Sequence, residues 1–154
     1  LYLALALRAV ELNAEYLEAA YDEQLDVFSQ LRAAGDAYAK FHLENPLALR
    51  LLSLHDVDSR SDPRVKEVAA EIRKGLQSML DRQEDLVQLA LEEGGNNEVS
   101  ASAVNVFLFA AWNGSISMYS RGQLSRKELT GVLEAGQNLA IGAISSGNAA
   151  GLLA

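Results

Sequence analysis

The sequence predicts an all-α protein, built as a helical bundle of five to six antiparallel helices. Leu, Ala, Glu, Gln, Lys and Arg dominate the chain and β-branched residues are sparse, which favours helices. Apolar residues recur at helical spacing, and no sustained alternation of apolar and polar residues indicates a strand. A chain of 154 residues is one domain by length and is large enough to bury a core.

The first two helices are predicted over residues 1–20 and 22–44, each from an apolar stripe. The second should end at Asn45, because the residue before Pro46 avoids the helical region. Pro46 then suits the first turn of a short helix over 46–54, with Asn45 as its N-cap. The stripes consist of Leu3, Leu7, Val10 and Ala14 in the first helix and Leu25, Phe28, Leu31, Gly35, Tyr38 and Phe41 in the second.

The longest helix is predicted over residues 63–93, after a loop at 55–63. Asp62 supplies an N-cap and Pro63 the first helical position, a combination typical of helix starts. The glycine pair at 94–95 ends the helix. Its apolar stripe contains Val65, Val68, Ile72, Leu76, Met79, Leu86 and Ala90, with Leu89 at the edge.

The two C-terminal helices differ from the others in polarity. Residues 99–120 contain no charged side chain and are apolar on two faces, so the helix there must be covered all round. The last helix opens with an S-x-x-E capping box formed by Ser125 and Glu128. We expect residues 145–154 to form a frayed tail.

These two helices predict a homodimer. Both carry small residues that let helix backbones approach closely, and they are too apolar for the outer layer of a monomer. The economical explanation is an isologous four-helix interface; the alternative is that other helices of the same chain cover them. The predicted interface residues are Phe107, Ala111, Gly114, Met118, Leu129, Val132, Leu133, Gly136, Ala140 and Ala143.

Composition excludes several functional classes. The net charge of −8, without a basic cluster, argues against direct binding to DNA. The absence of cysteine excludes disulfides and thiolate metal sites, and it fits a cytoplasmic protein. No apolar run approaches the roughly 20 residues of a membrane span. The opening stretch also lacks the basic region of a signal peptide, so we expect no membrane partner.

No motif supports an enzyme, a metal or a cofactor. The histidines, His42 and His55, are not preceded by the glutamates that a di-iron bundle requires. Residues 56–67 space their acids like a calcium loop, but Arg60 stands at a ligand position and Ser61 where the turn needs glycine. No Gly-rich phosphate loop, Ser-His-Asp set or zinc motif occurs. We therefore expect a non-enzymatic protein without a cofactor.

The remaining function is binding of a small molecule. Polar and aromatic side chains among apolar helix faces are typical of pockets in helical bundles, although each such residue is more often core filler than ligand contact. Trp112 and Gln83 are favoured, because a buried indole N–H or amide must find a partner. The candidate ligand-binding residues are Tyr38, Phe41, His42, Met79, Gln83, Asn105, Phe109, Trp112 and Asn113.

The whole chain resembles the C-terminal effector-binding and dimerisation domain of TetR/AcrR-family transcriptional regulators. The opening, LYLALALRAVE, looks like the start of the linking helix that follows the family's helix-turn-helix head. Residues 38–52, YAKFHLENPLALRLL, are similar to an aromatic-rich helix that ends at an x-E-N-P corner. Trp112 and Gly114, followed by LSRKEL, resemble the closing helix pair of the family.

The resemblance implies that residues 1–20 are a linking helix and that residues 21–154 are the effector-binding and dimerisation domain. A hydrophobic or aromatic effector in each core pocket would favour a conformer whose two heads no longer match operator DNA. The family's DNA-reading head is absent from this chain, so no DNA contact is assigned to any residue here. The alternative function is a free-standing helical binding or scaffold module with no DNA partner, and a helix-turn-helix ending just before Leu1 would discriminate the two.

Overall fold

The computed structural model describes residues 2–52 and 62–154, and these residues form helices and turns without a strand. The elements are α1 (Tyr2–Glu18), α2 (Val27–Glu44), α3 (Ala48–Leu52), α4 (Pro63–Glu93), α5 (Ala101–Ser120), α6 (Arg126–Ser145) and the 3₁₀ helix η1 (Ala149–Leu152). The all-α prediction is therefore confirmed for the described chain.

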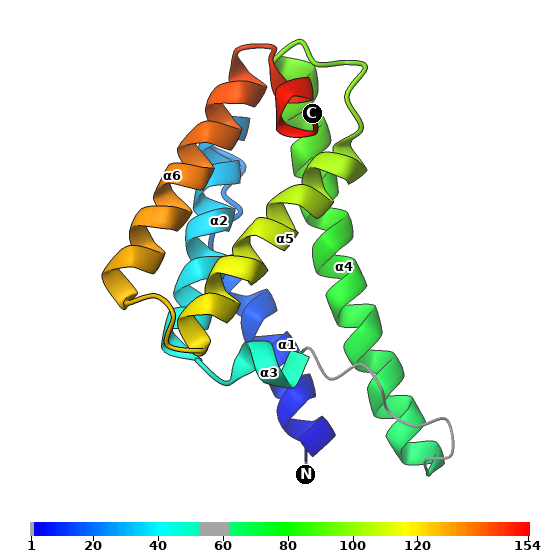
Figure 1. Ribbon diagram of the computed structural model, residues 1–154. Helices are drawn as coiled ribbons and strands as arrows, with labels where there is room; N and C mark the ends of the chain where they lie inside the picture. Colours follow the sequence, from blue (N-terminus) through cyan, green and yellow to red (C-terminus); the bar gives the residue numbers. More distant parts are fainter. Residues whose placement is uncertain (1, 53–61) are drawn as a thin grey trace.

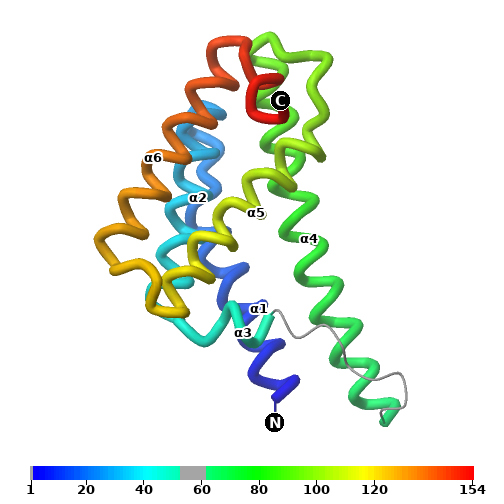
Figure 2. The backbone as a smooth tube through the Cα atoms, viewed as in Figure 1, coloured from blue at the N-terminus to red at the C-terminus, as the bar shows by residue number. Residues whose placement is uncertain are grey.

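The helices form one bundle along the long helix α4 (Figure 1). Helix α1 packs against α2, α3 and α4, while α5 crosses between α4 and α6. Helix α2 also contacts α4 and α6, so it lies at the centre of the bundle. The backbone trace in Figure 2 shows the two chain ends at opposite ends of the molecule.

Two predicted helix starts are confirmed by their caps. The Asp62 carboxylate accepts the backbone N–H of Arg64 at 2.8 Å, and Pro63 begins α4. At α6 the full capping box forms, because Ser125 and Glu128 each accept the other's backbone N–H. Such caps depend on residues no more than three positions apart, which is why the sequence alone reveals them.

The start of α2 and the role of Asn45 differ from the prediction. Helix α2 begins at Val27 because Asp26 caps it, accepting the N–H of Ser29 at 3.0 Å. Asn45 is the C-cap of α2, and its backbone and side-chain N–H groups both donate to the Phe41 carbonyl. It is therefore not the N-cap of α3, which starts later, at Ala48. Most of the predicted loop at 55–63 lies outside the described residues.

The expectation of a frayed C-terminal tail is wrong. Ala149 is fully buried and begins η1. The buried Asn96 side chain holds this end in place, since it donates to the Ile144 carbonyl at 2.7 Å and accepts the Ala149 N–H at 2.9 Å. Gly94 lies against the same carbonyl, so closely that a Cβ on it would overlap the Ile144 oxygen.

Part of the predicted dimer interface on helix α6 is buried in the core of the chain itself. Leu129, Leu133 and Ala140 are buried there, so these three are not available to a partner, contrary to the prediction. The reason is that α6 carries two apolar stripes, and neighbouring helices cover one of them. The covered stripe consists of Leu129, Leu133, Gln137, Ala140 and Ile144.

We predict that Gly94→Ala destabilises the protein by about 1–3 kcal/mol, because the added methyl group must displace backbone rather than a flexible side chain. Gly131→Ala is the matched control, since nothing lies near its added Cβ in α6. The control should stabilise the helix by about 0.5–1 kcal/mol. Urea unfolding of both variants measures the two effects, and equal stabilities would contradict the close approach at Gly94.

Candidate functional site

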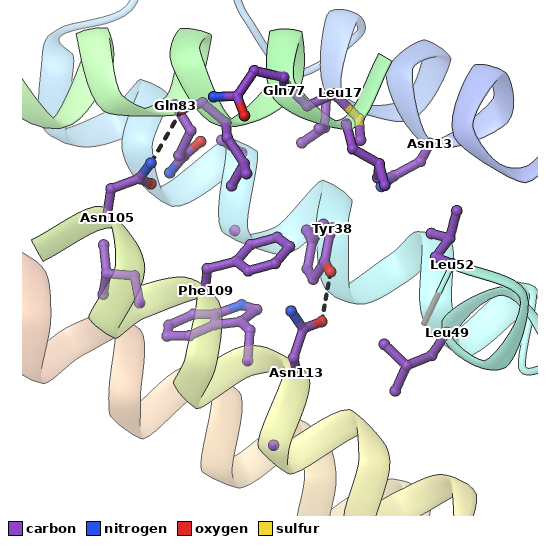
Figure 3. Close-up of a pocket in the computed structure, with 18 of the residues that line it drawn as sticks. Asn13, Leu17, Tyr38, Leu49, Leu52, Gln77, Gln83, Asn105, Phe109 and Asn113 are labelled. Atoms are coloured by element: carbon purple, nitrogen blue, oxygen red, sulfur yellow. Dashed lines mark hydrogen bonds between the residues drawn. The ribbon is translucent and has the colours of Figure 1, made fainter. Parts of the chain in front are cut away.

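The candidate site is a cavity of about 720 Å³ inside the bundle. All six α-helices contribute to its lining, which is mainly apolar (Figure 3). Cavities of this size and character are typical of sites for drug-sized ligands.

Small residues at core-facing positions create the space. Ala6 of α1, Ala34 and Gly35 of α2, and Ala69 of α4 all line the cavity. A helix position that faces the core normally carries a large side chain to fill the interior at crystal-like density. Alanine at these positions leaves volume unfilled, whereas the space beside Gly35 is occupied by the side chains of Gln137 and Trp112.

Tyr38 of α2 and Asn113 of α5 form a hydrogen-bonded pair in the cavity lining. The Tyr38 hydroxyl donates to the Asn113 side-chain oxygen at 2.7 Å (Figure 3). Burial raises the pKa of Tyr38, so the phenol stays protonated and keeps its role as donor. Because the Asn113 oxygen is occupied, its amide nitrogen remains as a donor.

Tyr21 and Gln83 form a second tyrosine–amide pair, in which the tyrosine is again the hydrogen-bond donor. The Tyr21 hydroxyl donates to the Gln83 side-chain oxygen at 3.1 Å, and burial raises the pKa of Tyr21 to about 12. The Arg82 guanidinium lies 4.0 Å from the centre of the Tyr21 ring and pairs with Glu18. The Tyr21–Gln83 hydrogen bond leaves the Gln83 amide nitrogen without a partner among the described residues, and Gln83 lines the cavity.

Three further polar atoms of the lining are buried without a hydrogen-bond partner among the described residues. They are the side-chain oxygens of Asn13 and Asn105 and the indole nitrogen of Trp112. The Asn105 amide is nevertheless oriented, because its nitrogen donates to the Leu80 carbonyl of α4 at 3.1 Å. Unpaired buried polar groups are costly, and they are expected at sites that serve binding rather than stability.

Trp112 connects the cavity with the contact between α2 and α6. A Cβ added to Gly35 or to Gly136 would lie only 3.6–3.7 Å from the indole ring, so the ring passes between two glycines. Beside it, the Gln137 side-chain nitrogen donates to the Arg32 carbonyl at 2.5 Å and ties α6 to α2.

The structure brings most of the predicted ligand-binding residues to one cavity. Phe41 and His42 do not line it: both are buried in the core, and the His42 ring lies 4.6 Å from Tyr38 and 4.8 Å from Phe41. The seven that line it are Tyr38, Met79, Gln83, Asn105, Phe109, Trp112 and Asn113.

Sequence reasoning missed Asn13, Arg73 and Gln137, which also line the cavity. Asn13 and Gln137 each occupy a stripe position in an otherwise apolar helix face, and this signal could have identified them. Arg73 gave no such signal, because an exposed arginine on a long polar helix is ordinary.

A second feature is an apolar surface on α5 and α6, which we name the α5–α6 face. Of the predicted interface residues, Phe107, Ala111, Gly114, Met118 and Val132 are exposed on these helices, and Gly136 and Ala143 are half-buried. The α5–α6 face consists of Val106, Phe107, Ala110, Ala111, Gly114, Met118, Val132, Ala135, Leu139 and Gly142.

The described ranges, 2–52 and 62–154, hold neither a cluster of potential metal ligands nor a membrane-spanning helix. No three or more potential metal-ligating side chains gather there, and residues 56–61 of the calcium-like segment lie outside these ranges. None of the helices in the same ranges combines the length and hydropathy needed to cross a membrane. Comparison of the chain with family models, with curated proteins and with solved structures found no match.

We predict that His42 makes the protein less stable in mild acid. Burial lowers the pKa of His42 from 6.5 to about 4, so the unfolded chain takes up the proton first as pH falls. Stability is therefore full above pH 6.5 and declines between pH 6.5 and 4, by up to about 3 kcal/mol.

The measurement is urea unfolding across this pH range for the wild type and for His42→Leu. The two proteins share every other ionisable side chain, so the difference between the two curves isolates His42. The variant should lose the extra acid dependence, and parallel curves would show that His42 is not buried in its neutral form.

Proposed function

We propose that this chain is the ligand-sensing and dimerisation domain of a TetR-type transcriptional regulator, in which a small molecule occupies the cavity and alters the affinity for DNA. The observation that carries the proposal is the cavity itself. Apolar walls bind an apolar body, and oriented amides give it specificity.

Unused polar atoms support a binding role over a purely structural one. A core that served stability alone would replace Asn13 and Asn105 by apolar residues, because a buried oxygen without a partner costs about 1–3 kcal/mol. The proposal assigns no DNA contact to this chain, since a net charge of −8 opposes phosphate binding.

The α5–α6 face supports dimerisation with a second copy of the chain. Val106 is 65% exposed and Leu139 is 72% exposed, and burial of such side chains is favourable. Two copies that each carry a charge of −8 repel one another, so an interface is favoured where it adds no close pairs of like charge. Helix α5 contains no charged side chain, so the α5 half of this face adds none.

Nile red, a neutral apolar dye, tests the cavity. We predict that the wild type binds it in the micromolar range with enhanced dye emission, because the apolar lining removes the dye from water. Ser117→Phe places a ring in the cavity and should weaken binding by about tenfold or more.

The matched control is Ser120→Phe, on the exposed end of the same helix and outside the lining. It should bind the dye like the wild type. Equal binding by both variants would mean that the dye occupies another surface, and a wild type that fails to bind would count against the proposed function.

Sedimentation tests the dimer. We predict that the wild type is a dimer at tens of micromolar and that Leu139→Asp shifts it to a monomer, because each interface would then bury two unpaired carboxylates. Leu89→Asp is the control: Leu89 is 57% exposed on α4, away from the α5–α6 face. A monomeric wild type, or equal effects of the two substitutions, would exclude this interface.

A further inference from the structure

We infer that the ligand is an elongated, largely apolar monocarboxylate whose carboxylate pairs with Arg73 at the edge of the cavity. The inference rests on the proposed function, because it concerns the ligand of the same cavity. It adds the charge, the shape and the orientation of that ligand.

Charge is the first argument. Arg73 is the one charged side chain among the described residues that line the cavity, and its own position is exposed. No ion pair joins Arg73 to a carboxylate of residues 2–52 and 62–154. Several other described arginines are also unpaired, and Arg73 differs from them in lining the cavity. An unpaired guanidinium at the edge of a cavity offers a carboxylate two parallel charge-assisted hydrogen bonds.

Ligands of other charge fit less well. A cation would meet no carboxylate in the described lining, and it would lie near the positive charge of Arg73. A neutral ligand would gain only the apolar contacts and would leave Arg73 unused. The acidic chain as a whole repels anions, so a monoanion is favoured only where Arg73 offsets that repulsion.

The amides of the lining contain both donors and acceptors. Tyr21 and Tyr38 occupy the side-chain oxygens of Gln83 and Asn113, so these two residues present amide N–H groups. Asn13 and Asn105 contribute unpaired oxygens. Gln83 lies about 15 Å from Arg73 along α4, so its N–H group would meet the far end of the ligand and not the carboxylate.

Helix α4 sets the shape. Arg73 and Gln83 are ten residues apart on it, which corresponds to about 15 Å along the axis. Leu76, Met79 and Leu80 line the cavity between them, with Gln77 as the one polar residue of this stretch in the lining, so the intervening wall is mainly apolar. An extended alkyl chain such as that of dodecanoate matches this arrangement, with its head at Arg73 and its body along the leucines.

The test compares dodecanoate with dodecanol, which has the same chain and no charge. Binding to the full chain is measured at pH 8, below the micelle concentration, from the fluorescence of Trp112, the single tryptophan. We expect dodecanoate to bind the wild type roughly tenfold more tightly than dodecanol, as charge-assisted hydrogen bonds are worth about that factor.

Arg73→Gln should weaken dodecanoate binding roughly tenfold and leave dodecanol binding unchanged within about twofold. Lys74→Gln is the matched control, because it removes the same charge from the adjacent position, outside the lining. It should leave both affinities unchanged, which separates a specific pairing from a general change in net charge.

The outcomes distinguish this inference from the proposed function. Equal affinity for the two ligands, or a dodecanoate affinity that Arg73→Gln does not lower, would overturn the carboxylate while leaving a cavity that binds apolar molecules. Failure of both ligands and of Nile red to bind the wild type would overturn the proposed function as well.

Discussion

The junction between α2, α5 and α6 is the contact on which the other features of this bundle depend. The Trp112 ring passes between Gly35 and Gly136, and the Gln137 side chain joins α6 to the Arg32 carbonyl of α2 beside it. The close approach at Gly35 is to Gln137, because a Cβ there would lie 2.7 Å from the Gln137 side-chain nitrogen. The same indole lines the cavity, so a single side chain closes the helix junction on one side and bounds the candidate site on the other.

Two tyrosine hydroxyls orient the amide side chains that line the cavity. A free amide side chain can rotate to offer either its oxygen or its nitrogen, but Tyr21 and Tyr38 donate to the oxygens of Gln83 and Asn113 and fix them. Burial holds both phenols protonated, since it raises their pKa values. In an apolar, low-dielectric interior such fixed dipoles act strongly on a ligand, which is why a few polar groups suffice for selectivity.

Helix α5 lacks charged side chains because it borders two apolar regions, the cavity and the α5–α6 face. Asn105 and Trp112 turn toward the cavity, whereas Val106 and Gly114 belong to the exposed α5–α6 face. Gly114 reaches the cavity lining as well, so the two surfaces meet on this helix. In the proposed function, a ligand that shifts α5 changes the dimer contact directly, and a binding energy that differs between two arrangements of the helix is all that the coupling requires.

The sequence by itself determined the helical class, the starts of α4 and α6 and seven of the residues that line the cavity. Caps such as Ser125–Glu128 act over three residues, and polar positions on apolar stripes are visible in any single helix. Only the tertiary structure decided that Asn96 binds Ala149, that Leu129 and Leu133 face inward, and that His42 lies in the core while Arg73 borders the cavity. The reason is that α6 has two apolar stripes and the sequence does not say which of them its neighbours cover, because those neighbours lie far away in the chain.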